Sequence, residues 1–98
     1  MTPGALARRL LEHLYFVEPY ERLWRELEEP EPVVRDELLR LVQARWVRVY
    51  AWDPDAHAYR PTDVFDADHL QAYAFQISGT GMRVLRAGYA ISDPDRNP

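Results

Sequence analysis

The sequence predicts a single α+β domain in which helices come first and a small antiparallel sheet and a short final helix follow. Apolar residues recur at helical spacing up to about residue 43, and two later segments alternate between apolar and polar residues as half-buried strands do. The 98 residues leave room for one core and no second domain. We expect the domain to span residues 1–91 and residues 92–98, which include no apolar residue, to form a frayed tail.

The composition narrows the class of protein. With 47% hydrophobic and 29% charged residues, the chain has the balance of a folded globular protein. It contains no cysteine, which excludes disulfides and thiolate chemistry, and the cytoplasm is the expected compartment. No apolar run approaches the ~18 residues needed to cross a bilayer, so we expect neither a signal peptide nor a membrane anchor. The net charge of -4 gives no overall basic balance for nucleic acid, although a local patch would suffice.

Two amphipathic helices are predicted at the start of the chain. The first runs from Ala5 to about Val17, and the second begins after Glu18-Pro19, since proline favours the first helical turn and disfavours helix in the residue before it. The first apolar stripe comprises Leu6, Leu10, Leu14 and Val17. The second comprises Tyr20, Leu23, Trp24 and Leu27.

A third helix, starting near Glu31, leads directly into a strand. Pro32 lies in its first turn, and acidic side chains lie near its positive end. Its core face is expected to carry Val34, Leu38, Leu41 and Val42. In the strand from Trp46 to Trp52, the face with Val47, Val49 and Ala51 is expected to meet the core. The opposite face then holds Trp46, Arg48, Tyr50 and Trp52.

A hairpin and an insert are predicted next. The segment Asp53-Pro54-Asp55-Ala56 suits a type I turn, after which residues 57–60 could return as the hairpin partner. Residues 61–71 are ambiguous. Thr62 or Asp63 could cap a short helical turn there, or the segment could be an irregular loop.

A second strand and a final helix complete the fold. A strand at Tyr73–Ile77 could pair with the strand at Trp46–Trp52. The roughly 18 residues between them are then too many for a structureless connection, so the insert needs structure or a task of its own. Ser78 could cap a final helix whose Met82 and Leu85 face inward.

Two segments resemble the winged helix-turn-helix superfamily of bacterial type. The segment LLRLVQARWVRVY resembles its leucine-rich recognition helix followed by a small residue, an aromatic residue and a valine-rich strand. The segment QISGTGMRVL resembles the polar residue, glycine and apolar helix that follow its last wing strand. The resemblance covers Leu6 to about Leu85 and implies a winged-helix fold with a wing at the hairpin. Arg45 departs from it by standing where the family usually has a glycine, and residues 53–71 are longer and more acidic than a plain wing.

The resemblance implies DNA binding through the third helix, but the charges argue against it. The candidate contacts are Arg35, Arg40, Gln43, Arg48 and Arg60. Acids on the same helix and aspartates throughout residues 53–68 would repel phosphates, whose neutralisation supplies most non-specific affinity. The alternative is that these acids only cap helices and solvate an acidic protein, which leaves DNA binding open.

The aromatic strand face offers a different use. Tryptophan, tyrosine and arginine are enriched at interface hot spots, and the candidate interface is Trp46, Arg48, Tyr50 and Trp52. Alternatively, residues 61–71 cover these side chains as a second small core, since large exposed aromatic patches are uncommon on monomers. A homodimer contact would satisfy both interpretations. We therefore expect a protein partner or a homodimer, with a DNA-binding transcriptional regulator as the alternative.

The sequence offers no enzyme, metal or cofactor site. Asp66, Asp68 and His69 form its one cluster of acid and imidazole groups, but metal sites need three or four convergent ligands, so a solvated turn is preferred. The segment Gly79-Thr80-Gly81 lacks the lysine and the strand-loop-helix context of a phosphate loop. We expect a non-enzymatic domain that works by binding.

Overall fold

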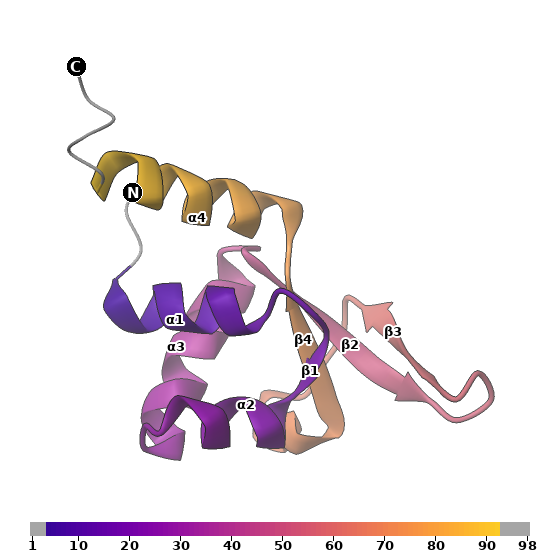
Figure 1. Ribbon diagram of the computed structural model, residues 1–98. Helices are drawn as coiled ribbons and strands as arrows, with labels where there is room; N and C mark the ends of the chain where they lie inside the picture. The colour runs from indigo at the N-terminus through magenta and orange to yellow at the C-terminus, as the bar shows by residue number, and fades with distance from the viewer. Residues whose placement is uncertain (1–3, 93–98) are drawn as a thin grey trace.

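The computed structural model describes residues 4–92, which form helices and strands around an apolar core (Figure 1). In chain order the elements are α1 (Ala5–His13), β1 (Glu18–Pro19), α2 (Tyr20–Leu27), α3 (Glu31–Gln43), β2 (Val47–Asp53), β3 (Ala58–Thr62), the short 3-10 helix η1 (Ala67–Ala72), β4 (Tyr73–Ile77) and α4 (Gly79–Ser92). Among the described helices, none combines the length and the apolar character that a membrane crossing requires.

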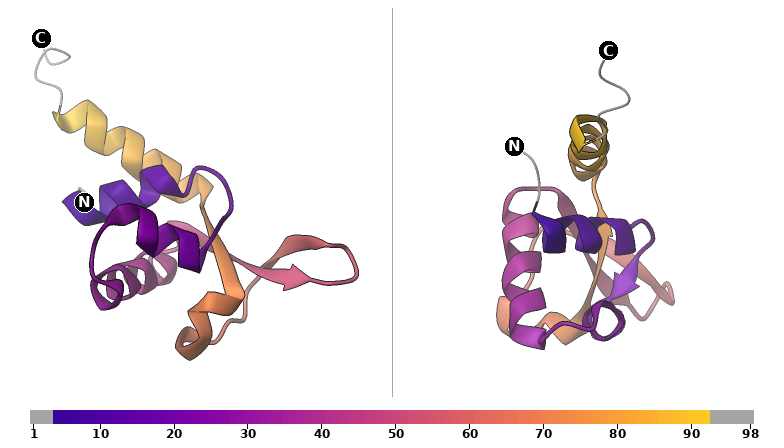
Figure 2. Two further views of the ribbon diagram at one scale, coloured as in Figure 1. Left: turned by 60° about the horizontal axis from the view of Figure 1, so that its bottom comes forward. Right: turned by 60° about the vertical axis from the view of Figure 1, so that its left-hand side comes forward.

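The strands form one antiparallel sheet in the order β1-β4-β2-β3. Figures 1 and 2 show α1, α2 and α3 on one side of this sheet, which we call the inner face, while α4 extends from the end of β4. The other side, the outer face, has none of the described helices over it. The α+β class and the pairing of the two predicted strands are confirmed.

The core lies between the inner face and the first three helices. The predicted helix stripes supply most of its fully buried side chains, which include Leu10, Leu14, Leu23, Leu27, Val34, Leu38 and Phe75. Leu11 is buried as well, although the predicted stripe of the first helix did not include it. Helix periodicity therefore identifies which side of each helix faces the core, but not every residue that is buried on that side.

The first helix is shorter than predicted, because it ends at His13 and not near Val17. The backbone N–H of Ile77 donates to the carbonyl of Leu14 at 2.7 Å, and Glu18–Pro19 then pairs with β4 as β1. These contacts join segments about sixty residues apart, which local periodicity cannot report. The predicted end of this helix was wrong for that reason.

The junction between α3 and β2 keeps the left-handed turn that glycine usually supplies. Arg45 has a φ of 64°. Its N–H donates to the carbonyl of Val42, and the N–H of Trp46 donates to the carbonyl of Leu41, both at 3.0 Å. This is the Schellman pattern, which satisfies the last carbonyls of a helix. Arginine thus carries the conformational cost expected at this position, which is about 1 kcal/mol relative to glycine.

Arg45→Gly is expected to raise the free energy of unfolding by about 1 kcal/mol, because glycine adopts a positive φ without a Cβ clash. Urea unfolding followed by circular dichroism measures the change. Ala44→Gly is the matched control. Ala44 has a φ of -75° and a ψ of -5°, where glycine only adds freedom to the unfolded chain and a loss of about 0.5–1 kcal/mol is expected. Equal effects at the two positions would contradict the assignment of strain to Arg45.

The hairpin forms at the predicted turn, but its returning strand is β3 (Ala58–Thr62) and not residues 57–60. Oδ1 of Asp53 accepts the backbone N–H groups of Asp55 and Ala56, at 3.0 and 3.3 Å. An aspartate that bonds its own backbone two residues later is a typical turn former. The turn therefore fixes the register in which β3 returns beside β2.

The insert contains a short helix, but a different residue caps it. The cap is Asp66, whose side chain accepts the N–H of Asp68, and not Thr62 or Asp63 as predicted. The hydroxyl of Thr62 instead bonds the backbone N–H and carbonyl of Val64. This turn carries the chain away from β2, so β3 ends at Thr62.

Both edge strands of the sheet are short and contain a proline. β1 ends with Pro19, and β3 carries Pro61 opposite Tyr50. Proline has no N–H to donate and is accepted in sheets at such edges.

The final helix begins at the predicted cap. Oγ of Ser78 accepts the N–H of Gly81 at 3.0 Å. Leu85 is buried and Met82 packs against the core, as expected. The helix continues to Ser92, the first residue of the expected tail, and residues 93–98 of that tail lie outside the described residues.

Candidate functional site

The outer face of the sheet carries aromatic side chains from β2 and β3. Trp52 is 49% exposed and lies opposite Tyr59, with the ring centroids 5.2 Å apart and the rings at 74°. Edge-to-face contacts of this kind are favourable between aromatic rings. The sequence prediction named Trp52 but not Tyr59, although the predicted turn could have identified the two as cross-strand neighbours.

Tyr50 lies on the outer face but is buried. Its hydroxyl donates to Oε1 of Gln76 at 2.6 Å, and the guanidinium of Arg48 lies 5.8 Å from its ring centroid. A cation near the face of an aromatic ring is attracted to it. Tyr50 therefore lies beneath the exposed side chains of the outer face. Arg48 is the exposed residue of this pair.

Trp46 does not lie on the outer face, where the sequence predicted it. It is half-buried and packs against the core cluster. It precedes β2, which begins at Val47, and its carbonyl accepts the N–H of Ser78. Of the four predicted interface residues, Arg48 and Trp52 are thus the exposed ones.

The insert packs on the inner side of the sheet and leaves Trp52 uncovered. Phe65 lies against Tyr73 with ring centroids 5.9 Å apart, and both pack against the core cluster. Leu70 of η1 is buried in the same cluster. Residues 61–71 therefore do not cover Trp52, as the alternative interpretation expected, because Phe65 and Leu70 pack against the core and Val64 is 81% exposed.

An aromatic pair that the sequence prediction missed borders the outer face. Tyr15 and Phe16 are 56% and 72% exposed, and their ring centroids are 5.2 Å apart. Nε2 of Gln76 donates to the carbonyl of Tyr15 at 3.2 Å, which ties this loop to the same glutamine that Tyr50 contacts. The sequence prediction missed this loop because it extended the first helix to about Val17. Two adjacent aromatic residues outside the apolar stripe were a signal that could have identified it.

The candidate DNA contacts are mostly engaged with carboxylates. The ion pairs are Arg40 with Glu37 at 3.0 Å, Arg35 with Asp36 at 3.8 Å, and Arg60 with Asp53 at 2.9 Å. Gln43 is exposed on α3. Exposed ion pairs stabilise a fold little, but each acid lowers the positive potential that its arginine offers to a phosphate.

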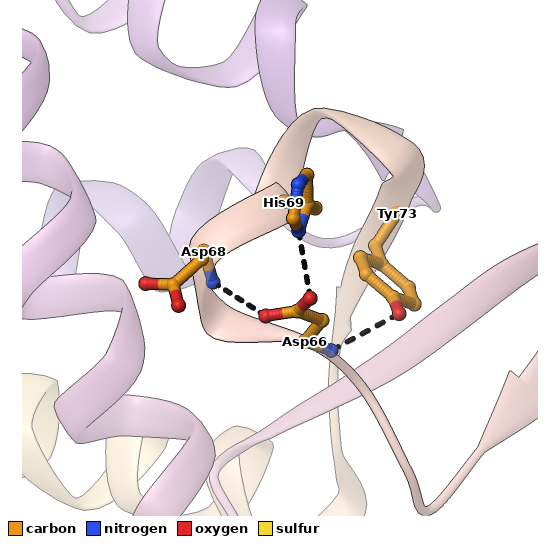
Figure 3. A network of polar contacts seen from close by, with 4 residues as sticks. All are labelled: Asp66, Asp68, His69 and Tyr73. Carbon is orange, nitrogen blue, oxygen red and sulfur yellow. Dashed lines mark hydrogen bonds and ion pairs between the residues drawn. The ribbon is translucent and has the colours of Figure 1, made fainter.

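The acid and imidazole cluster in η1 builds a turn (Figure 3). The carboxylate of Asp66 accepts the N–H of Asp68 at 2.9 Å and contacts Nδ1 of His69 at 2.7 Å, while the hydroxyl of Tyr73 accepts the N–H of Asp66 at 3.0 Å. The backbone N–H of Asp68, and then His69, hold the pKa of the Asp66 carboxyl below its usual value. Within residues 4–92, no group of three or more His, Cys, Asp or Glu residues could hold a metal ion.

Asp66→Asn is expected to destabilise the domain at neutral pH, because asparagine can keep the cap but loses the charge that Asp68 and His69 stabilise. The folded pKa lies below the ordinary value of 3.8. The contribution is therefore present above pH 3.8 and disappears as the pH falls through the folded pKa. Urea midpoints of the two proteins should converge over that range. Asp55→Asn, in the hairpin turn, is the control, and a difference at Asp66 that does not change with pH would contradict the prediction.

A buried tyrosine joins α2 to the start of α3. The hydroxyl of Tyr20 donates to Oε1 of Glu31 at 2.6 Å. Burial, and then the hydrogen bond to Glu31, raise the pKa of Tyr20. A hydroxyl that holds its proton this firmly is suited to positioning α3 and not to proton transfer near neutral pH.

The comparisons with known proteins find no relative. No family model, no curated protein and no solved structure matches the chain. The class that the described residues define is an α+β domain with a four-stranded antiparallel sheet, helices on its inner face and aromatic side chains on its outer face.

Proposed function

We propose that this chain is a non-catalytic winged-helix binding module that acts by protein contact, including contact between two copies, through the outer face of the sheet. Trp52 is the observation that carries the proposal. About half of this side chain, 49%, stays exposed beside Tyr59 on a face that the described helices leave open. Buried tryptophan and tyrosine side chains supply much of the energy of protein interfaces.

The neighbours of Trp52 support the same use. Tyr50 is held by Gln76 and by Arg48, so its ring is a rigid base that loses little entropy on binding. Arg48 lies four residues from Trp52, or about 13 Å along a strand. Tyr15 and Phe16 add exposed aromatic side chains at the far border of the same face. A stable interface typically buries about 800 Å² on each partner.

The acidic hairpin would form the rim of this interface. Asp55 at its tip is exposed, and Asp53 forms an ion pair with Arg60. Charged rims guide association and select partners more than they add affinity. A partner with basic residues beside an apolar centre fits best, and in a homodimer the two hairpins would have to point apart.

The alternative is a DNA-binding transcriptional regulator with α3 in the major groove. Its contacts would be Arg35, Arg40, Gln43, Arg48 and Arg60. The order of helices followed by a hairpin supports this use. The acids paired with three of these arginines and the net charge of -4 favour protein contact instead.

A titration of labelled duplex DNA at low salt separates the two functions. Micromolar affinity that falls steeply with salt would overturn protein contact as the main function, and no binding would remove the DNA alternative. Sedimentation equilibrium over a range of protein concentrations tests self-association. A monomer at every concentration would exclude the two-copy form and leave a different protein as the partner.

The proposal requires no cofactor, and it keeps the cytoplasm as the place of action because the chain contains no cysteine.

A further inference from the structure

A groove of about 830 Å³ lies between the second half of α3, the start of β2 and the insert. Its apolar lining includes Leu39, Val42, Val49 and Phe65, and Arg45 and Arg48 also line it. Gln43, Thr62 and Asp63 line it as well, so the groove is polar as well as apolar. Its volume lies within the range of about 300 to 1,000 Å³ that is typical of ligand sites. Trp52 does not line this groove, so the groove is separate from the exposed end of the outer face.

Val47 also lines the groove. The N–H of Ser78 donates to the carbonyl of Trp46, and in an antiparallel ladder the residues that bond one neighbour alternate with those that bond the other. Val47 therefore directs its N–H and C=O away from β4, to the side on which β3 lies. β3 ends at Thr62, opposite Val49, so within residues 4–92 no strand pairs with Val47 on that side. Val47 is buried, and the N–H and C=O groups of buried residues nearly always have a hydrogen-bond partner.

Two positive charges line the groove with no carboxylate partner among the described residues. In a chain with a net charge of -4, other arginines form ion pairs with Asp or Glu, as Arg9, Arg25 and Arg60 do. Arg45 and Arg48 form none within the described part of the chain. Arg45 also keeps the left-handed conformation that glycine would adopt at lower cost. Strain retained at an exposed charged residue is a reason to look for a use of its side chain.

We propose that this groove binds an extended peptide segment of a partner protein in which an acidic residue lies next to an apolar one. The acidic side chain pairs with the two arginines through charge-assisted hydrogen bonds. The apolar side chain packs between Leu39 and Phe65. The peptide backbone adds to β2 at Val47 as a short strand, a known mode of peptide recognition.

A peptide fits these features better than other anions do. A carboxylate on a small molecule or lipid would engage the arginines but has no backbone to give Val47 both a donor and an acceptor. DNA would bring a row of phosphates against the acids of α3, whereas the peptide brings a single acidic side chain.

A library of random ten-residue peptides displayed on phage, panned against the full chain, tests the proposal. Arg45→Gln protein serves as the counter-selection, so that only sequences that need the guanidinium are kept. The expected enrichment is Asp or Glu beside Leu, Ile, Val or Phe. Enrichment of basic sequences, or no enrichment above the counter-selected background, would overturn the proposal.

Fluorescence anisotropy with the most enriched peptide then measures each contact. Arg45→Gln is expected to weaken binding about tenfold, as the loss of a charged hydrogen bond does. Arg86→Gln, which changes an exposed arginine of α4, is the matched control and should leave affinity unchanged. Arg45→Gly should also weaken binding while it stabilises the fold, so unfolding cannot account for the loss. N-methylation at the peptide centre should abolish binding, because it removes a strand hydrogen bond.

Other outcomes separate this site from the outer face. Trp52→Ala should leave peptide affinity unchanged. Affinity that falls with Trp52→Ala and not with Arg45→Gln would overturn the groove and favour the outer face. Displacement of the peptide by an equal concentration of duplex DNA would also overturn it, in favour of nucleic acid.

Discussion

Gly81→Ala is expected to lower the free energy of unfolding by about 3 kcal/mol. A Cβ at this position would clash with the carbonyl oxygen of Trp46 and would lie 2.8 Å from Cγ1 of Ile77. The oxygen belongs to the backbone and cannot rotate away. It also accepts the N–H of Ser78, so displacing it would strain the bond that joins the start of α4 to β2.

Chemical unfolding compared with Gly79→Ala provides the test. Gly79 lies in the same helical turn, and a Cβ there meets nothing within 4 Å. Alanine at this control position should be neutral or stabilise slightly, because it is the better helix former. Equal destabilisation at both positions would show that the helix start needs glycine for its backbone and not for the close approach to Trp46.

Trp52→Ala is expected to weaken the proposed protein contact by about tenfold to a hundredfold, the range of an interface hot spot. The same change should cost the isolated domain little, because about half of the side chain, 49%, is already exposed and its main described ring contact is Tyr59. Sedimentation equilibrium measures the contact between two copies, and a thermal melt followed by circular dichroism measures the fold.

Val33→Ala is the matched control for Trp52. Val33 is 45% exposed on α3, close to the 49% of Trp52, but lies outside the outer face. Its replacement should leave association unchanged. Loss of the fold in Trp52→Ala would show that the tryptophan belongs to the core, and unchanged association of a folded variant would move the contact to another surface.

The parts of the fold that the sequence predicted well are those with local causes. α2 begins directly after Pro19, and α3 contains Pro32 in its first turn, where the fixed φ of proline favours a helix start. The alternation of β4 and the cap at Ser78 are equally local. The end of α1 was missed because a bond from Ile77, far along the chain, decides where it stops.

The candidate surface was predictable only where strand alternation holds. Trp52 and Arg48 follow that alternation and are exposed. Trp46 belongs to the helix-ending turn, whose geometry depends on Arg45 adopting a conformation that its residue type disfavours. Tyr15 is fixed by Gln76 across a sequence separation of 61 residues, which no local pattern contains.

The prolines at the sheet edges limit what this protein can assemble into. An open edge with free N–H groups recruits strands from other molecules and starts fibres. Pro19 and Pro61 remove donors from the two outer strands of the described sheet. Association through the outer face should therefore produce pairs of finite size that do not add further molecules, even at concentrations where an unprotected sheet would begin to polymerise.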